Sequence, residues 1–413
     1  MDLGFGFFIA LLSKRMTYQS EIMITMLYLL VLTISRVNGQ DADPPLNITF
    51  ITDAIAKGAV CLDGSPGAYY FAQGFEDGVD NWIVYLPGGA WCNSKDDCLR
   101  RSKTGGADGL GSSKNAAPKT LLPIESPNKS INPDFYNWNK VYIRYCDGAS
   151  FMADVEAVDP ETQLYLRGRR IFISVLEELM ATKGMANAAN ALLVGDSAGG
   201  LATILNCDRF SSLLPMARRV KCISDSGFFI QAKDLPEDNA RRYFASIAAF
   251  HELAEFLPES CTQRMDPGLC LFPENVVDDI QTPLFLLNSD FDIYQITYQI
   301  NPNPPDEEGW KNCTKVFQNL HYCTASQLHI IMDFHTAFLE TVAGLNDNPT
   351  RGLFINSCYI HDFVYIQSNW QGTPTLQNKT VQQAFGDWYF ERSSVQLIDT
   401  QHPYPINCNT QIV

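Results

Sequence analysis

Charged residues are scarce in this chain of 413 residues, and the basic ones are the scarcer kind. Only 18% of the side chains are charged while 46% are hydrophobic, so the chain can bury a large core and cannot be mostly disordered. Lys and Arg number 30 against 46 Asp and Glu, which gives a formal net charge of −16. A general nucleic-acid binder needs a basic surface to attract phosphate, so this deficit argues against that class of protein.

Several motifs of familiar binding sites are also missing. No GxGxxG follows the first predicted strand and no P-loop is present, so no nucleotide is implied. No CxxC pair occurs, which disfavours a zinc ribbon or a thioredoxin-type redox site. Residues 251–255 (HELAE) begin like the zinc motif HExxH, but Glu255 stands where the second histidine is required. We therefore expect neither a metal nor a cofactor.

The amino terminus has the pattern of a targeting segment. Basic residues precede an apolar run, residues 22–34, that is too short to cross a bilayer of about 30 Å as a helix. Polar residues follow, and Val37 and Gly39 stand at the −3 and −1 positions of a signal-peptidase site. We predict a signal peptide over residues 1–39; an uncleaved signal anchor is the alternative.

Two further features agree with secretion. The 12 cysteines are an even number and many for a cytosolic chain. Six of them form closely spaced pairs, which suit local disulfides worth about 2–3 kcal/mol each: Cys92 and Cys98, Cys261 and Cys270, Cys313 and Cys323. Four N-x-[ST] sequons mark candidate glycosylation sites: Asn47, Asn128, Asn312 and Asn378.

Short apolar runs alternate with helix-like stretches along residues 40–413. Five of these runs predict strands: residues 82–86, 140–145, 191–194, 220–225 and 282–287. Helical spacing of apolar residues predicts helices over residues 164–180 and 201–214. This alternation favours an α/β fold, a mostly parallel sheet with helices on both faces and its ligand site beyond the carboxyl ends of the strands. No domain boundary is evident, so we predict one domain.

Residues 195–200 (GDSAGG) contain the pattern G-x-S-x-G between a predicted strand and a predicted helix. That context is typical of a nucleophile elbow, in which a strained turn lifts the serine above the sheet. Small neighbours avoid clashes in the turn, and the following helix points its first amides at a developing oxyanion. Ser197 is therefore the candidate nucleophile, and an ordinary glycine turn is the alternative.

A serine hydroxyl needs a histidine base, and all six histidines follow Ser197, as the order Ser…Asp/Glu…His of this hydrolase class requires. His361 comes directly after an apolar run, where a strand gives way to a loop. His329 and His335 lie in a helix-like stretch and fit surface or packing positions, while His402 lies in a tail-like segment. We therefore predict His361 as the base.

The carboxylate that orients this base is less clear from spacing. Asp292 follows the predicted strand that ends at residue 287, and Asp290 and Asp225 are its rivals. Each of them is also compatible with a turn or a helix cap. Spacing alone leaves the three open.

Donors for an oxyanion are also present. Residues 86–92 (LPGGAWC) follow a strand well upstream of the elbow, as the second oxyanion loop should, and Ala198 directly follows the serine. A simple glycine turn is the alternative for the upstream loop. Just after it, residues 99–103 (LRRSK) contain Arg100 and Arg101, a candidate basic platform for an anionic substrate or a solvated loop.

Taken together, these motifs resemble the pectin acetylesterase family of plants, which is related to the animal carboxylesterase Notum. The resemblance runs from about residue 61 to residue 404 and rests on six ordered motifs: 88–94 (GGAWCNS), 143–151 (IRYCDGASF), 197–203 (SAGGLAT), 225–229 (DSGFF), 282–285 (TPLF) and 354–359 (FINSCY).

The resemblance implies an α/β-hydrolase fold and a Ser-Asp-His triad, whose roles fall by motif on Ser197, Asp292 and His361. The family's oxyanion donors fall on Ala90, Trp91 and Ala198. It also implies three disulfides: Cys61–Cys146, Cys92–Cys98 and Cys358–Cys408. The chain departs from the family at Asp196 and Asp362, where the plant proteins usually have cysteine.

We therefore expect a secreted, monomeric serine esterase of the cell wall that removes O-acetyl groups from pectin through an acetyl-enzyme. A chain this negative is repelled by a polyanionic substrate over a Debye length of about 8 Å, which is why Arg100 and Arg101 are of interest. A carboxylesterase for longer acyl groups, as Notum is, and a non-catalytic carbohydrate-binding glycoprotein are the alternatives.

Overall fold

The structure is a computed structural model that describes residues 44–103, 110–232, 239–300, 309–314, 320–345, 348–400, 405–406 and 408. The chain divides into two compact units, Met1–Pro44 and Pro45–Val413. Apart from Pro44, every described residue belongs to the second unit. The predicted signal peptide, residues 1–39, lies outside the described residues.

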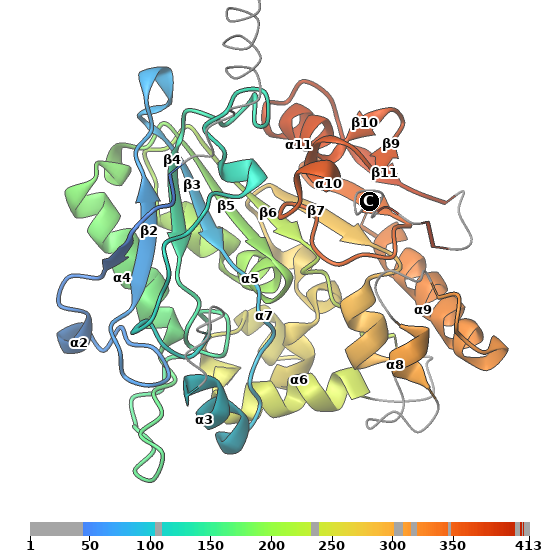
Figure 1. Ribbon diagram of the computed structural model, residues 1–413, viewed down its shortest axis with the longest axis horizontal. Helices are drawn as coiled ribbons and strands as arrows, with labels where there is room; N and C mark the ends of the chain where they lie inside the picture. Colours follow the sequence, from blue (N-terminus) through green and yellow to red (C-terminus); the bar gives the residue numbers. More distant parts are fainter. Residues whose placement is uncertain are drawn as a thin grey trace, which may run out of the picture. The chain divides into compact units, whose positions relative to one another are not determined.

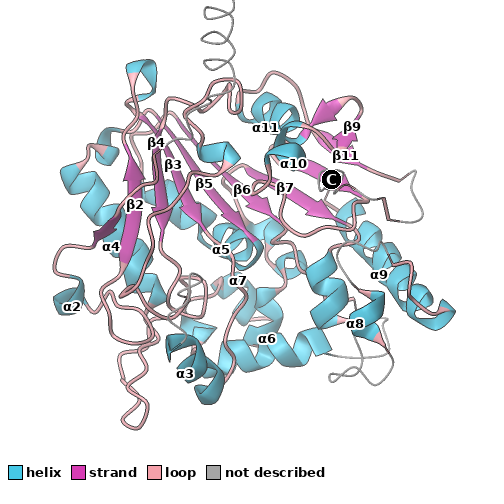
Figure 2. Ribbon diagram, viewed as in Figure 1, coloured by secondary structure: helices cyan, strands magenta, loops and turns pink. Residues whose placement is uncertain are grey.

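A nine-stranded sheet forms the centre of the second unit (Figures 1 and 2). Its strands lie side by side in the order β1 (Ile48–Phe50), β2 (Ala68–Ala72), β4 (Asn139–Ile143), β3 (Asn81–Leu86), β5 (Asn190–Asp196), β6 (Arg219–Asp225), β7 (Leu284–Ser289), β8 (Gly352–Asn356) and β11 (Gln396–Ile398). From β4 to β11 every neighbouring pair is parallel. Only β1 and β2, at one edge, run antiparallel to their neighbours.

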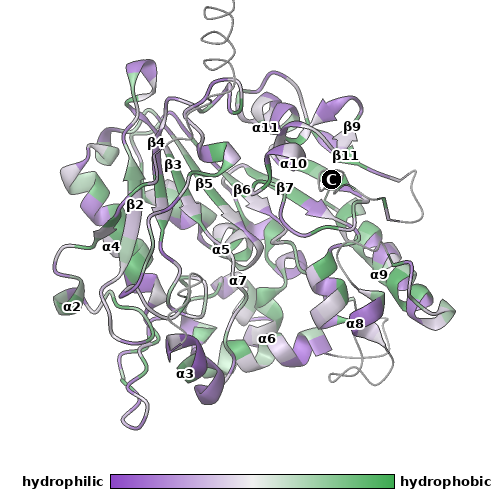
Figure 3. Ribbon diagram, viewed as in Figure 1, coloured by the Kyte–Doolittle hydropathy of each residue, from purple (hydrophilic) through white to green (hydrophobic). Residues whose placement is uncertain are grey.

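Both faces of the sheet are buried, and the alternation of side chains along each strand explains how. In β3, Trp82 and Val84 belong to one apolar cluster, whereas Ile83 and Tyr85 belong to another. Because successive side chains point to opposite faces, each cluster covers one face. In Figure 3 the central strands are accordingly mostly green.

Helices cover each face. The first cluster contains buried side chains of α4 (Gly168–Thr182), α5 (Ser197–Leu213), α6 (Asn239–Phe250) and α9 (Ala325–Ala343). The second contains those of α10 (Gln367–Gln371) and α11 (Val381–Tyr389). The remaining elements are short: α2 (Ala54–Lys57), α3 (Lys95–Lys103), α7 (Glu259–Thr262), α8 (Trp310–Cys313), and the hairpin of β9 (Thr375–Leu376) and β10 (Lys379–Thr380).

Six disulfides join all 12 cysteines: Cys61–Cys146, Cys92–Cys98, Cys207–Cys222, Cys261–Cys270, Cys313–Cys323 and Cys358–Cys408. The three pairs with short spacing and the three pairs that the family resemblance implies, which share Cys92–Cys98, are all among them. The sixth pair, Cys207–Cys222, ties α5 to β6 and was not expected.

The predicted α/β class, with a mostly parallel sheet and helices on both faces, is confirmed. Two predicted helix starts are four residues off: α4 begins at Gly168 rather than at residue 164, and α5 begins at Ser197 rather than at residue 201. Residues 197–200 are Ser, Ala and two Gly, so they carry no helical pattern of apolar residues. No helix in the described part of the chain has the length and hydropathy of a membrane span.

Candidate active site

Three predicted site residues follow three strands at the same edge of the sheet. Ser197 begins α5 directly after β5, Asp292 follows β7, and His361 follows β8. The three strands belong to a run of parallel neighbours in the order β5, β6, β7, β8. Their carboxyl ends therefore lie along one edge, where a ligand site is expected in an open α/β sheet.

The turn at Ser197 is strained and tightly packed. Ser197 has a φ of 52°, in the left-handed region that a serine seldom adopts. A Cβ added at Gly195 would lie 2.2 Å from the carbonyl oxygen of Gly199, and one added at Gly199 would lie 1.9 Å from that of Leu86. Only glycine fits at these positions, which is the local condition for a nucleophile elbow.

The three side chains form one chain of hydrogen bonds. His361 Nε2 lies 2.7 Å from the hydroxyl oxygen of Ser197, and His361 Nδ1 lies 2.7 Å from Oδ2 of Asp292. Asp292 is fully buried, and its Oδ1 accepts a hydrogen bond from the backbone N–H of Gln295. Burial opposes the charged imidazolium, but the carboxylates of Asp292 and Asp362 outweigh it and raise the pKa of His361.

The loop that carries His361 is held from β6. The carboxylate of Asp225, the last residue of β6, accepts hydrogen bonds from the backbone N–H groups of Phe363 and Val364. The ring of Tyr294 stacks on the imidazole of His361, with 5.3 Å between the ring centroids. Asp225, a rival for the orienting carboxylate, therefore anchors the backbone beyond the histidine and does not contact its ring nitrogens directly.

The other rivals lie elsewhere. Oδ2 of Asp290 faces Nδ1 of His335 at 3.3 Å and accepts from the hydroxyl of Ser357. His335 is buried on α9, while His329 is exposed on the same helix beside Asp333. His402 lies outside the described residues. Within the described residues, His361 is the histidine that contacts Ser197.

Two side chains hold the loop after β3 by hydrogen bonds to its carbonyl oxygens. Arg101 donates to the carbonyl oxygens of Gly89 and Ala90, and the hydroxyl of Tyr145 also donates to that of Ala90. A trans peptide points its N–H away from its C=O, so the N–H groups of Ala90 and Trp91 point away from Arg101. Neither has an acceptor among the described residues, and the φ of Ala90 is 51°, a strained value for alanine.

The third predicted donor, Ala198, is the second residue of α5. The first N–H groups of a helix have no partner within the helix and carry its positive end. Ala90 lines the cavity in front of Ser197, whereas the Trp91 side chain packs behind the loop against Phe229 and Phe244.

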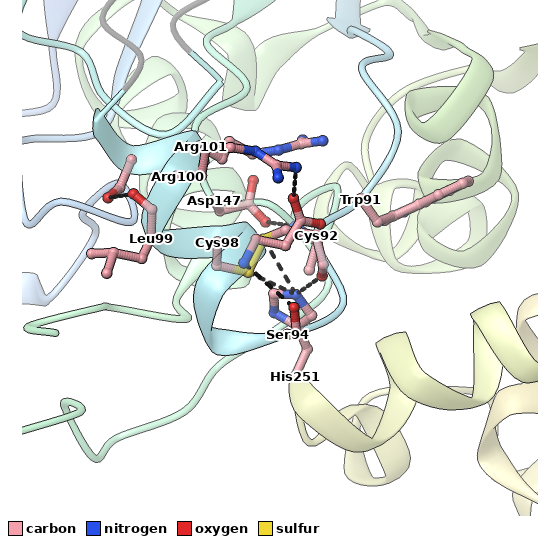
Figure 4. Close-up of a disulfide and its surroundings, with 12 residues drawn as sticks. Trp91, Cys92, Ser94, Cys98, Leu99, Arg100, Arg101, Asp147 and His251 are labelled. Carbon is pink, nitrogen blue, oxygen red and sulfur yellow. Dashed lines mark hydrogen bonds and ion pairs between the residues drawn. A yellow bond between two sulfur atoms is a disulfide. The ribbon is translucent and has the colours of Figure 1, made fainter. Parts of the chain in front are cut away.

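The two basic residues predicted to bind substrate lie outside this cavity. Arg100 is on α3, is 76% exposed and pairs with Asp97. Figure 4 shows Arg101 on one side of the Cys92–Cys98 disulfide and His251 on the other, with Arg101 bonded to the loop. Arg101 therefore positions the loop after β3. Helix α3 is strongly hydrophilic over its length (Figure 3).

The cavity in front of Ser197 has a volume of about 870 Å³. Six tyrosines contribute to its wall: Tyr142, Tyr145, Tyr243, Tyr294, Tyr298 and Tyr365. Arg144 and Gln299 also line it. Sequence reasoning missed these eight residues, because no motif marks them; Arg144 and Tyr145 lie in the segment 143–151, whose side chains were read only as a family match.

Three further carboxyl groups lie around Ser197 and His361: Asp196 and Asp225 are buried, and Asp362 is 25% exposed. Burial in the first place, and the proximity of other acids, raise the pKa values of Asp196, Asp225 and Asp362. Asp196 accepts hydrogen bonds from the hydroxyl of Tyr85 and the N–H of Gly88. Oδ1 of Asp362 lies 3.5 Å from Nε2 of His361.

One group of side chains has the composition of a metal site. Cys92, Cys98 and His251 bring their ligand atoms within 4.8 Å of one another, and no second such group occurs in the described ranges. Both sulfur atoms are joined in a disulfide and are not available as thiolates. His251 Nε2 donates to the carbonyl of Cys92, and burial lowers the pKa of His251 to about 4.

Three of the four sequons lie on the surface: Asn47, Asn312 and Asn378 are exposed. Asn128 is half-buried, and its side-chain oxygen accepts hydrogen bonds from the backbone and the hydroxyl of Ser130.

Comparison with known proteins identifies relatives of the whole chain. Residues 40–411 match the family described as Pectinacetylesterase. Pectin acetylesterase 11 of Arabidopsis thaliana is 42% identical over 398 residues, which cover 95% of this chain and 97% of that protein. Palmitoleoyl-protein carboxylesterase notum1' of Xenopus laevis is 31% identical over 275 residues, or 62% of this chain and 54% of that protein.

A solved structure shares the fold. The Wnt deacylase Notum of Drosophila superposes with a TM-score of 0.70 at 22% identity, covering 88% of this chain and 98% of that one. The fold, the ordered motifs and the match over residues 40–411 agree. The chain therefore belongs to the pectinacetylesterase family of ester hydrolases.

Proposed function

We propose that this protein is a secreted serine esterase that removes O-acetyl groups from cell-wall pectin. The observation that carries the proposal is the hydrogen-bonded chain Ser197–His361–Asp292 at the wall of a large cavity. A serine, a base and an orienting carboxylate in this order are the requirement for acyl transfer. The acetyl ester and the polysaccharide are inferred from relatives that are named pectin acetylesterases.

In the first step the hydroxyl oxygen of Ser197 attacks the acetyl carbonyl carbon, and His361 Nε2 takes the hydroxyl proton. Asp292 holds the imidazole by Nδ1 and stabilises its positive charge. When the tetrahedral intermediate collapses, the C–O bond to the sugar breaks and His361 returns the proton to the leaving sugar oxygen. The acetyl group remains on Ser197 until water, which gives a proton to His361, attacks its carbonyl carbon. The bond between this carbon and the Ser197 oxygen then breaks, His361 returns the proton to that oxygen, and acetate leaves.

The amides of Ala90, Trp91 and Ala198 are the donors for the oxyanion of each intermediate. Arg101 and Tyr145 hold the carbonyl groups of this loop by hydrogen bonds. This supports the role, since it fixes the N–H groups of Ala90 and Trp91 before substrate binds. Fixed donors need no reorganisation during the reaction, and losing one typically costs about 10²–10³-fold in kcat.

A sugar substrate fits the wall of the cavity. Six tyrosine rings give flat apolar faces with hydroxyl groups at their rims, which suit a ring that is itself apolar on its faces and polar at its edge. Tyr298 is 70% exposed, so this wall extends to the surface.

Cavity size supports a second candidate, a carboxylesterase for longer acyl chains. A volume of about 870 Å³ exceeds what an acetyl group alone requires, and related proteins are named palmitoleoyl-protein carboxylesterases. Rates on nitrophenyl esters of increasing chain length separate the candidates: an acetyl specialist is fastest at two carbons, and a long-chain enzyme at eight or more.

Secretion is part of the proposal. The disulfides support it, because such bonds persist in oxidising compartments. We propose residues 1–39 as the signal peptide, residues 40–413 as one esterase domain, and the four sequons as glycan sites of a monomer in the cell wall.

Replacement of the nucleophile tests the activity. We expect Ser197→Ala to lower kcat for acetate release from acetylated pectin on the order of 10⁴-fold or more, because the acetyl-enzyme can no longer form. Ser212→Ala, an exposed serine near the other end of α5, is the control and should retain full activity.

Labelling with a fluorophosphonate probe gives a second readout. An activated serine reacts with it and an unactivated one does not, so wild type should be labelled and Ser197→Ala should not. A non-catalytic carbohydrate-binding glycoprotein would take up no label in either form, and that result would refute the proposed esterase.

A further inference from the structure

Arg144 stands at the wall of the cavity without an anionic partner. It is the residue directly after β4, and its backbone N–H donates a hydrogen bond to the carbonyl oxygen of Ala68. Its Nε atom is buried and has no hydrogen-bond partner, and no carboxylate of the described residues forms an ion pair with its guanidinium. Its positive charge opposes the burial that raises the pKa values of the Tyr70 and Tyr142 phenols.

Among the described residues, no other arginine has a buried side-chain nitrogen that lacks a hydrogen-bond partner. Arg170 pairs with Asp154 and Glu156, and Arg351 pairs with Asp278 and donates to the carbonyl of Val277. An unpaired buried donor costs about 1–3 kcal/mol and more when it is charged. Arg144 is therefore an exception that calls for a ligand.

A second polar side chain in the same cavity is also unpartnered. Gln299 is only 3% exposed, and neither its amide nitrogen nor its amide oxygen has a partner. Arg144 follows β4, on one side of β5, and Gln299 follows β7, on the other side. The cavity thus presents unsatisfied polar groups from both flanks of the strand that leads to Ser197.

We propose that Arg144 binds the carboxylate of a sugar acid in the substrate; this deepens the proposed esterase function and rests on it. A guanidinium matches a carboxylate with two parallel hydrogen bonds. One strand, β3, separates β4 from β5, so the ends of β4 and β5 are about 10 Å apart. That distance suits an acetyl ester at Ser197 and a carboxylate on the same or the next sugar ring.

Arg144 also resolves the mismatch of charge between enzyme and substrate. The chain carries a net charge of −16, and two acids, Asp196 and Asp362, line the cavity beside it. Burial raises the pKa values of both acids, which lessens their negative charge. A guanidinium inside the cavity is screened less by salt than a surface cation, so it attracts a carboxylate where the surface as a whole repels it.

The test compares acetylated polygalacturonate with the same polymer after methyl esterification of its carboxyl groups. We expect wild type to have the higher kcat/KM on the free acid. In Arg144→Gln the ratio of the two kcat/KM values should fall roughly 10- to 100-fold, the range for a charged hydrogen bond. Arg144→Lys, which keeps the charge and loses the fork, should recover part of the ratio.

Two controls separate binding from folding. Arg218→Gln removes the same charge from an exposed position just before β6, at the opposite edge of the sheet, and should leave the ratio unchanged. Deacetylated oligogalacturonate should inhibit wild-type hydrolysis of 4-nitrophenyl acetate more strongly than its methyl ester does. This comparison needs no variant, so misfolding of Arg144→Gln does not affect it.

Failure of the inference is distinct from failure of the proposed function. If wild type releases acetate from both polymers at equal rates, or if Arg144→Gln keeps the preference, Arg144 does not read the carboxylate although the esterase stands. If wild type hydrolyses 4-nitrophenyl acetate but neither polymer, the pectin substrate itself is wrong and the inference falls with it.

Discussion

Two aspartates stand directly beside members of the proposed triad in the sequence. Asp196 precedes Ser197, the proposed nucleophile, and Asp362 follows His361, the proposed base. Both are carboxyl groups with raised pKa values. Asp362 lies 3.5 Å from the nitrogen of His361 that faces Ser197, so the charge of this residue acts directly on the base.

Removal of that charge should shift the pH profile. His361 accepts a proton only when it is neutral, so kcat/KM rises as the pH passes the pKa of His361. The negative charge of Asp362 stabilises the imidazolium and raises this pKa. In Asp362→Asn we expect the acid limb of the kcat/KM profile to move to lower pH, by roughly one unit.

The matched control is Asp333→Asn, which removes an exposed acid that pairs with His329 on α9. Its acid limb should coincide with that of wild type. An acid limb that stays in place or moves to higher pH in Asp362→Asn would show that Asp362 does not set the pKa of His361.

At the scale of residues, the sequence predicted those candidates whose chemistry requires a particular local sequence pattern. Ser197 is marked by glycines that the elbow requires, and His361 by the end of a strand. Asp292 was not separable from Asp290 and Asp225 by spacing, because all three follow strands and only the tertiary packing decides which one faces the imidazole. Arg144 could not be predicted from the sequence for a similar reason, because its lack of a hydrogen-bond partner depends on how the chain folds.

At the scale of elements, the strands were predictable because parallel strands buried on both faces are continuous apolar runs. The predicted runs 82–86 and 191–194 lie within β3 and β5, and their ends differ from the ends of these strands by at most two residues. The start of α5 was missed because its first turn is shaped by the elbow. Helix α3 and its relation to the oxyanion loop had no sequence signal, since contacts between a side chain and distant carbonyls leave no periodic pattern.

The Cys92–Cys98 disulfide joins that loop to α3, which carries Arg101. We expect Cys92→Ser with Cys98→Ser to lower the free energy of unfolding by about 2 kcal/mol, the value for a loop this short. It should also lower kcat for acetate release, because Arg101 then holds the oxyanion loop less firmly. Thermal unfolding and initial rates measure the two effects.

Cys261→Ser with Cys270→Ser is the comparison, because that disulfide closes a loop of similar length that does not line the cavity. Its stability should fall by a similar amount while kcat below the melting temperature stays near that of wild type. Equal losses of kcat in both double variants would attribute the effect to general destabilisation.

For the whole molecule, buried acids govern the response of stability to pH. Five carboxyl groups, four of them buried and Asp362 partly exposed, have raised pKa values: Asp147, Asp196, Asp225, Asp290 and Asp362. For Asp147 and Asp290 the raised value is about 6. Above the ordinary pKa of an aspartate the folded state therefore holds more protons than the unfolded state, and stability falls as pH rises.

The histidines modify this trend. The raised pKa of His361 has the same sign, because the stability it contributes is lost as pH rises through its folded-state pKa. His251, whose pKa is about 4, acts in the opposite sense between about pH 4 and its usual value near 6.5. Five acids outweigh one histidine, so stability should decline from weakly acidic to alkaline pH.

We therefore expect a melting temperature at pH 5 that exceeds the value at pH 8 by at least about 2 °C, the shift for a change of about 1.5 kcal/mol in a protein of this size. Thermal unfolding followed by circular dichroism from pH 4 to pH 9 measures it. Asp290→Asn removes one of the five acids and should flatten the decline. A melting temperature that climbs steadily from pH 5 to pH 8 would contradict this account.

The Cys358–Cys408 disulfide has a consequence for synthesis. It fastens the segment that leads to His361 to a residue 50 positions downstream. During translation the nucleophile and its strand emerge long before this tether exists. A nascent chain that has reached only residue 400 contains all three members of the proposed relay, yet its histidine segment is not tied in place. The tether that holds the histidine segment can therefore form only after residue 408 has been made and an oxidant has joined the two cysteines.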